Sequence, residues 1–186
     1  VLVGLALAAT CSMAWTRDAW ALPGLVLLAV FGLIGFVDDF VVPRKLKGKR
    51  GLGWKQKLAM QVGGCVLAMV LAGITHPVAI AMGTFVVLFF SNAYNFADGM
   101  DGLAGTLAVV ICGFAGAMAL GVGDLTTFAW LAILAGSMVP FLWMNAPPAR
   151  VFMGDVGALP IGALLGWVWL ELWRQGPSDL SVVGPL

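Results

Sequence analysis

The sequence predicts an all-α fold, a polytopic bundle of transmembrane helices that forms one integral membrane domain over residues 1–186. Hydrophobic residues make up 61% of the chain and charged residues only 10%, whereas a soluble domain has about 25% charged residues. The apolar residues also form long runs, and about 20 such residues in a helix cross a bilayer. The partner indicated by this composition is therefore the lipid bilayer. The formal net charge of +1 gives no indication of a nucleic-acid partner.

Seven apolar runs are predicted to cross the membrane as helices, and a truncated eighth begins near Leu180. Helices are expected because the runs are too long for strands, and because unpaired backbone groups cannot face lipid. The chain starts in the middle of the first run and has no initiator Met, so we expect a fragment that lacks both termini of a longer protein. The predicted spans are residues 1–15, 19–37, 58–75, 78–97, 103–123, 125–144 and 156–173.

The connections between these runs alternate between two faces of the membrane. One face receives the predicted loops 38–57, 98–102 and 145–155, and the other receives short turns. Cytoplasmic loops carry an excess of Lys and Arg, so the first face is predicted to be cytoplasmic. Its basic residues are Arg44, Lys45, Lys47, Lys49, Arg50, Lys55, Lys57 and Arg150, against Arg17 and Arg174 on the other face.

Two adjacent acids, Asp38 and Asp39, follow the apolar residues Phe36 and Val37. One interpretation is a polar pair that merely ends the helix at the membrane interface. However, acidic side chains at a helix C-terminus oppose the helix dipole, and two neighbouring carboxylates repel each other unless a cation lies close. Acids at the bilayer edge are costly, so metal or phosphate chemistry is the preferred hypothesis.

A second acidic motif follows the run 78–97, in the sequence SNAYNFADGMDG of residues 91–102. Asn92, Asn95, Asp98 and Asp101 bring polar groups to the membrane edge. The alternative is a turn in which Asp101 caps the next helix, because Asp is a favoured N-cap residue. A cap accounts for one Asp and leaves the other polar residues unexplained. The acid spacing also differs from that of an EF-hand.

The third acidic motif, NAPPARVFMGDVG over residues 145–157, precedes the run 156–173. Asp155 is either a metal or phosphate ligand or the N-cap of that helix. Asn145 could end the preceding helix ahead of two prolines. Phe152 could be an interfacial anchor or could stack on a base. Among the basic residues, whose main role is orientation, Lys57 is the best candidate for chemistry because it lies at the start of a span and near the acids.

Four segments together resemble the polyprenyl-phosphate hexosamine-1-phosphate transferases. They read GFVDDF, GLGWKQKLAMQ, SNAYNFADGMDGLAG and NAPPARVFMGDVGALPIG, and the resemblance runs through nearly the whole chain. The family usually has Ser where this chain has Ala158. The chain also lacks the family's early PTMGG loop and late His-rich loop, so we do not expect it to be active alone.

The resemblance implies an Mg²⁺-dependent enzyme of the bacterial inner membrane with its active site on the cytoplasmic face. NAPPA before VFMGD, and the long basic loop, look more like the members that transfer phospho-MurNAc-pentapeptide from UDP-MurNAc-pentapeptide to undecaprenyl phosphate, which gives lipid I and UMP. A homodimer is compatible with this resemblance. The implied metal ligands and catalytic residues are Asp38, Asp39 and Asp155, with the choice of base within the Asp38-Asp39 pair left open. The implied substrate-binding residues are Lys57, Asn95, Asp98, Gly99, Asp101, Asn145 and Phe152.

Two other functions remain as alternatives at this stage. The first is a sister enzyme that transfers N-acetylglucosamine 1-phosphate from UDP to the same kind of lipid. The second is a cation-coupled transporter. Transporters place their charged groups near the bilayer midplane in broken helices, whereas the acids here are predicted at span ends on one face.

Overall fold

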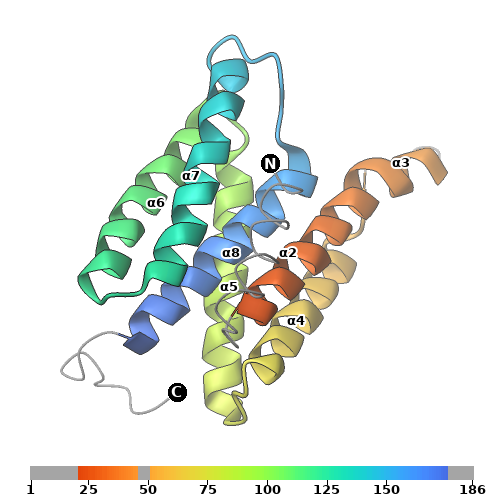
Figure 1. Ribbon diagram of the computed structural model, residues 1–186. Coiled ribbons are helices and arrows are strands. Elements are labelled where there is room, and N and C mark those ends of the chain that lie inside the picture. Colours follow the sequence, from red (N-terminus) through yellow and green to blue (C-terminus); the bar gives the residue numbers. More distant parts are fainter. Residues whose placement is uncertain (1–20, 46–50, 176–186) are drawn as a thin grey trace.

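The computed structural model describes residues 21–45 and 51–175, and their regular secondary structure is entirely helical. The described residues contain no strand, so the predicted all-α class is confirmed. The predicted runs 1–15 and 180 onward lie outside the described residues. The elements are α2 (Ala21–Phe36), η1 (Val37–Val41), α3 (Val42–Lys45), α4 (Trp54–Leu71), α5 (Pro77–Ala97), α6 (Leu103–Gly121), α7 (Leu125–Asn145) and α8 (Gly154–Gln175), as Figure 1 shows.

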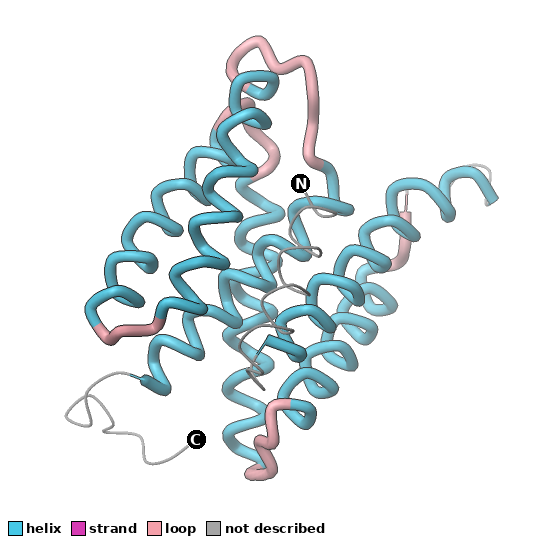
Figure 2. Tube along the Cα trace, viewed as in Figure 1, coloured by secondary structure: helices cyan, strands magenta, loops and turns pink. Residues whose placement is uncertain are grey.

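The helices form a polytopic membrane bundle. Five helical stretches among the described residues are long and apolar enough to cross a bilayer, namely Ala21–Lys45, Pro77–Ala97, Leu103–Gly121, Leu125–Asn145 and Gly154–Gln175. The last four correspond closely to predicted runs, whereas the first extends beyond the predicted 19–37. Loops join α4 to α5 and each later helix to the next (Figure 2). Helix α4 occupies Trp54–Leu71 in place of the predicted 58–75 and is not one of the five. Its first turn carries Lys55, Gln56 and Lys57, which lower its hydropathy.

The first described helix continues beyond the end that the sequence predicts. The run 19–37 was expected to stop before Asp38, with a loop following. Instead the chain passes through the π-helical turn η1 and continues helically to Lys45. Arg44 and Lys45 form the last turn of α3, where positive charge interacts favourably with the helix dipole. The acidic pair thus lies within a continuous helix.

Helix α8 is the central element of the bundle and packs mainly against α5 and α2. Most of its residues are buried, including Leu159, Ile161 and Leu164. Close packing against α5 requires Gly162, because a Cβ there would lie 2.7 Å from the Ser91 Cα atom. Small residues are the usual means by which membrane helices approach closely. Ser91 adds a hydrogen bond from its Oγ to the Leu159 carbonyl oxygen, at 2.9 Å.

A second close approach brings the start of α8 against α2. A Cβ on Gly35 would lie 2.3 Å from the Asp155 carbonyl oxygen, so no side chain fits at this position. Two apolar clusters flank α8. One contains Phe31, Cys65 and Met69 from α2 and α4, and the other contains residues of α6 and α7 such as Ala108 and Leu134. The core therefore surrounds α8 and fixes where its first turn lies.

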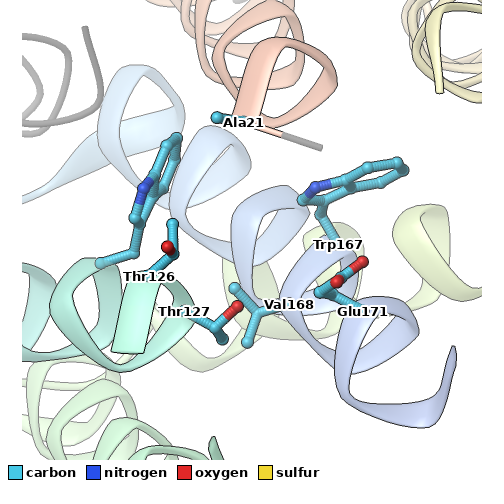
Figure 3. A pocket seen from close by; sticks show the side chains of 7 residues that line it. Ala21, Thr126, Thr127, Trp167, Val168 and Glu171 are labelled. Atoms are coloured by element: carbon cyan, nitrogen blue, oxygen red, sulfur yellow. The ribbon is translucent and has the colours of Figure 1, made fainter. Parts of the chain in front are cut away.

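The other end of α8 carries paired polar groups. Glu171 is buried and accepts hydrogen bonds from Arg174, with 2.6 Å between Nη2 and Oε1. Gln175 donates to Asp124 at the start of α7, with 2.8 Å between Nε2 and Oδ2. Beside them lies a cavity of about 30 Å³ between α2, α7 and α8, into which Thr127 and Glu171 project (Figure 3). These contacts hold the end of α8 close to the turn between α6 and α7.

Candidate functional site

Three carboxylates converge where η1 meets the first turn of α8. Asp38 and Asp39 come from η1, and Asp155 comes from α8. Each offers one oxygen atom, and these oxygens lie within 4.8 Å of one another. The three metal ligands implied by the resemblance therefore lie together in the structure, although Asp155 is far from the other two in the chain. The π-helical turn η1 carries Asp38 and Asp39, and such turns occur frequently at functional sites.

Lys57 binds two of these acids. Its Nζ donates to Asp38 Oδ2 at 3.1 Å and also to Asp155 Oδ2. Burial lowers the pKa of Lys57, but hydrogen bonds and charge from Asp155 and Asp38 outweigh burial, so the pKa is raised overall. The ammonium therefore stays charged and partly balances the cluster. Asn95 completes this set, because its Nδ2 donates to Asp155 Oδ1 at 2.9 Å.

The N-terminus of α8 is capped by acids from the two other motifs. Asp98 Oδ2 accepts from the Gly154 N–H at 3.0 Å, and Asp39 Oδ2 accepts from the Val156 N–H at 3.2 Å. Burial raises the pKa of Asp98, and the hydrogen bond from Gly154 partly offsets this effect. Negative groups at a helix N-terminus are also stabilised by the helix dipole. The alternative in which Asp155 caps its own helix is therefore wrong, since its carboxylate binds Lys57 and Asn95.

Hydrogen bonds between side chains and the backbone connect the two remaining loops. Asn145 is buried; its Oδ1 accepts from the Gly102 N–H at 2.9 Å, and its Nδ2 donates to the Val151 carbonyl oxygen at 2.8 Å. Asp101 Oδ2 accepts from the Ala149 N–H at 3.0 Å. The alternative role of Asp101 as a helix cap is wrong, because the N-cap of α6 is Gly102 and no side chain caps it. These bonds connect the loop 98–102 to the loop 146–153.

The segment that precedes α4 closes over the acids. The backbone N–H of Leu52 donates to Asp38 Oδ1. A Cβ on Gly51 would lie 2.6 Å from the same oxygen, so this backbone approaches the carboxylate as closely as glycine allows. The two oxygens of Asp38 are thus held by Leu52 and Lys57, which fixes the orientation of the carboxylate.

Two predicted substrate-binding residues lie outside this hydrogen-bonded set. Phe152 is 71% exposed, and Gly99 lies in the exposed part of the loop 98–102. Near that loop an open cavity of about 640 Å³ is bordered by Met100, Asp101 and Pro147. Phe152 and Gly99 are therefore accessible on the loop surface.

The site fits a divalent cation of the Mg²⁺ type. Mg²⁺ is bound in proteins through one or two carboxylates together with phosphate oxygens and water. Asp38, Asp39 and Asp155 supply carboxylate oxygens within the required reach of one another, and no soft ligand such as Cys or His belongs to this group. Asp38, Asp39 and Asp155 are therefore the residues that would hold such a cation.

Two polar residues next to the site, Gln61 and Asn92, form a hydrogen bond that the sequence did not predict. Gln61 follows Lys57 by one helical turn on α4 and is 1% exposed. Asn92 precedes Asn95 on α5 and donates to Gln61 Oε1 at 3.3 Å. The available signal was a lone amide at i+4 from Lys57 in an otherwise apolar run, since residues four apart share a helix face.

The fold and the site together define a polytopic helical membrane protein with an acidic, cation-compatible centre at one end of its bundle. The chain belongs to glycosyl transferase family 4, whose family model matches residues 21–172. This agrees with the resemblance drawn from the four sequence segments.

Two curated relatives of this chain share a name. The phospho-N-acetylmuramoyl-pentapeptide-transferase of Streptococcus pneumoniae serotype 2 (strain D39 / NCTC 7466) is 38% identical over 168 residues, which is 81% of this chain and 50% of the relative. The phospho-N-acetylmuramoyl-pentapeptide-transferase of Staphylococcus aureus (strain Newman) is 33% identical over 176 residues, 82% of this chain and 54% of the relative. The chain therefore spans about half the length of the curated relatives it matches.

Proposed function

We propose that the protein to which this chain belongs transfers phospho-MurNAc-pentapeptide from its UDP carrier to undecaprenyl phosphate. The products are lipid I and UMP. The observation that carries the proposal is the cluster of Asp38, Asp39 and Asp155, with their oxygens within 4.8 Å and Lys57 bound to two of them. The names of the relatives support this activity over the transfer of N-acetylglucosamine 1-phosphate.

The reaction joins two anions, so catalysis depends on positioning and charge neutralisation. An oxygen of the lipid phosphate attacks the sugar-linked phosphorus of the UDP-sugar. The bond from this phosphorus to the bridging oxygen breaks, and UMP leaves with that oxygen. Lys57 supplies positive charge beside the reacting phosphates, and Asp38 or Asp39 accepts a proton from the lipid phosphate where that phosphate is still protonated. Asn95 holds Asp155 in place.

Bound Mg²⁺ would supply charge neutralisation of the diphosphate. Asp155 and the pair Asp38 and Asp39 would hold it, since their oxygens lie close together. The loops 98–102 and 146–153 contribute the surface for the nucleotide. Asp98 and Asp101 shape that surface through their bonds to Gly154 and Ala149, and the exposed ring of Phe152 is available to stack on the uracil.

The site is proposed to face the cytoplasm of a bacterium. The described part of the acidic end includes Arg44, Lys45, Lys55, Lys57 and Arg150, whereas Arg174 lies at the other end of α8. Cytoplasmic segments carry the excess of Lys and Arg. A transporter is disfavoured because Asp38 and Asp39 lie beside the first turn of α8, at the acidic end of the bundle, whereas transporters place such groups near its middle.

Asp155→Asn in the full-length protein tests the proposal. Asn keeps the size of the side chain but removes the charge that a cation and Lys57 require. Loss of one such electrostatic contact costs about 3 kcal/mol or more of transition-state stabilisation, roughly a hundredfold or greater in rate. The assay is the release of UMP from UDP-MurNAc-pentapeptide with undecaprenyl phosphate and Mg²⁺.

A matched control is Asp124→Asn at the other end of the bundle. Asp124 caps α7 by accepting from the Thr127 N–H at 2.9 Å, and Asn caps a helix about as well as Asp. Turnover in this variant should stay close to that of the wild type. Wild-type turnover in Asp155→Asn would refute the catalytic role of Asp155. If the protein releases UMP from UDP-N-acetylglucosamine but not from UDP-MurNAc-pentapeptide, it has the sister activity.

A further inference from the structure

A cavity of about 310 Å³ lies between α4 and α5, next to the carboxylate cluster. Its polar lining consists of Lys57 and Gln61 from α4 together with Asn92 and Asn95 from α5. Lys57 and Asn95 are the residues that bind Asp155, so the cavity adjoins the proposed active site. It has far more space than the roughly 10–15 Å³ that one water molecule requires.

The rim of this cavity is apolar and faces outward. Trp54 is 72% exposed and Phe96 is 91% exposed, and both line the cavity. Trp is enriched at the level of the lipid head groups in membrane proteins, and the exposed Phe96 ring adds apolar surface beside Trp54. The cavity therefore joins a polar interior to a surface that suits a lipid.

Gln61 is the buried polar side chain of this cavity, and half of its amide is satisfied. Its Oε1 accepts from Asn92 Nδ2 at 3.3 Å, and the same Nδ2 donates to the Leu88 carbonyl oxygen at 2.8 Å. Asn92 must therefore present its NH₂ group to Gln61, which in turn must present its oxygen to Asn92. This network fixes which end of the Gln61 amide remains available.

The available end is a donor without an acceptor. Gln61 Nε2 has no hydrogen-bond partner in the described part of the chain, although the residue is only 1% exposed. Buried polar groups are nearly always paired, and an unpaired one requires a structural or functional reason. An unpaired NH₂ group beside a lysine provides the chemistry for an oxyanion, because both groups donate and neither accepts.

We propose that Gln61 contacts a phosphate oxyanion that occupies the α4–α5 cavity, with its Nε2 donating to a phosphate oxygen beside Lys57. Asn92 positions the amide for this contact. The inference rests on the proposed function, because it assigns this residue to one of the two phosphate-bearing substrates. The apolar rim favours the phosphate of a lipid over the diphosphate of a nucleotide.

Ligand binding to two variants of the full-length protein tests the inference without requiring turnover. Gln61→Leu removes the donor and replaces the amide with an apolar side chain of similar size. Gln61→Glu keeps an acceptor for Asn92 and replaces the donor with negative charge. The ligands are undecaprenyl phosphate in detergent micelles and, separately, UDP. The measured quantity is the ligand concentration that gives half of the maximal rise in Tm.

We expect Gln61→Leu to raise this concentration about tenfold or more for undecaprenyl phosphate and to leave that for UDP unchanged. Gln61→Glu should have the larger effect because its charge repels phosphate. Without ligand, the Tm of Gln61→Leu should equal or exceed that of the wild type, because the variant no longer buries an unpaired donor. A residue with a purely structural role would instead lower this Tm.

Thr84→Val is the matched control. Thr84 Oγ1 is also buried on α5 without a partner among the described residues, but Thr84 does not line the cavity. Its removal should leave both ligand responses unchanged.

Three outcomes decide the inference. A weakened response to UDP alone would keep the oxyanion contact and assign it to the nucleotide. Unchanged responses to both ligands in both Gln61 variants would overturn it. A lowered ligand-free Tm with equal losses for both ligands would assign Gln61 to the fold and would also overturn it. Absence of transferase activity would refute the proposed function. The ligand-binding result for Gln61 could still be interpreted, because binding is measured directly.

Discussion

Lys57 sets the charge balance of the acidic cluster. Three carboxylates within 4.8 Å repel one another, and a single ammonium contacts two of them. Lys57 lies in the first turn of α4, where positive charge opposes the helix dipole. The two ion pairs outweigh this disadvantage, which is why its pKa is raised despite burial. The residue therefore contributes to the site and not to the stability of its own helix.

Lys57→Met should reduce UMP release by about a hundredfold or more, because loss of one preorganised charge contact typically costs that much in rate. Met keeps most of the apolar stem and so limits the loss of packing. Lys55→Met is the control, since Lys55 is exposed and lies over the Trp54 ring at 5.5 Å without contacting the acids. Equal rates for the two variants would contradict the role of Lys57.

Asn145 provides a second prediction at this scale, one that concerns stability. Asn145→Leu removes both hydrogen bonds to the backbone, at Gly102 and Val151. Each lost hydrogen bond typically contributes about 0.5–1.5 kcal/mol, so the free energy of unfolding should fall by at least about 1 kcal/mol. Denaturant unfolding in detergent measures this fall. An unchanged midpoint would mean that the two loops do not depend on this amide.

At the scale of single elements, the helices could be predicted because each run of apolar residues ends at polar or Gly-Pro-rich segments. Helices α5 to α8 begin and end within a few residues of the prediction. The extension of α2 to Lys45 could not be predicted, because Asp38 and Asp39 have low hydropathy and resemble the end of a span. Asp38 contacts Lys57 and Leu52, and Asp39 contacts Val156. These tertiary contacts, which the local sequence does not reveal, favour the helical conformation there.

For the site, the sequence predicted which residues belong to it but not the role of each one. The three acidic motifs could be identified from the sequence, since acids at the ends of apolar runs are rare. Their individual roles could not be assigned, because an Asp before a helix looks the same whether it caps that helix or binds a partner. Asp155 was a candidate cap, and the structure gives this task to Asp98 and Asp39.

The contact between α5 and α8 leads to a prediction at the scale of elements. Gly162→Ala would place a Cβ 2.7 Å from the Ser91 Cα atom and 2.8 Å from the Phe90 carbonyl oxygen. Backbone atoms in two packed helices cannot move independently, and overpacking typically costs about 1–3 kcal/mol. We expect a lower Tm in detergent by several degrees.

Gly113→Ala on α6 is the matched control, because nothing lies within 4 Å of its Cβ position. Ala has a higher helix propensity than Gly by up to about 1 kcal/mol, so this variant should be as stable as the wild type or more so. If both variants lose the same stability, the close contact at Gly162 is not the cause.

For the whole molecule, the arrangement of the bundle separates two chemically different ends. The loops 98–102 and 146–153 lie at one end (Figure 1), together with the first turn of α8, which carries Asp155 of the acidic cluster. The turn between α6 and α7, together with Asp124 and Glu171, lies at the other. The bundle therefore has a defined polarity relative to the membrane.

Cysteine labelling in intact cells tests this polarity. In a background without Cys11, Cys65 and Cys112, single cysteines in place of Lys45, Met100 or Arg150 should all resist a membrane-impermeant reagent. All three positions are exposed and lie at the acidic end. A cysteine in place of Leu125, which is 68% exposed in the first turn of α7, should react. Labelling of any of the first three from outside would reverse the proposed orientation.

The capping of α8 by Asp39 and Asp98 has a consequence for biosynthesis. Both carboxylates precede α8 in the chain, by 117 residues from Asp39 to Val156 and by 56 from Asp98 to Gly154. They leave the ribosome first, since translation proceeds from the N-terminus. When α8 is inserted, the acceptors for its first N–H groups are already in the bilayer, and until then these acids have no helix terminus to bind. Assembly of the reactive centre is therefore the last event in the insertion of the described helices.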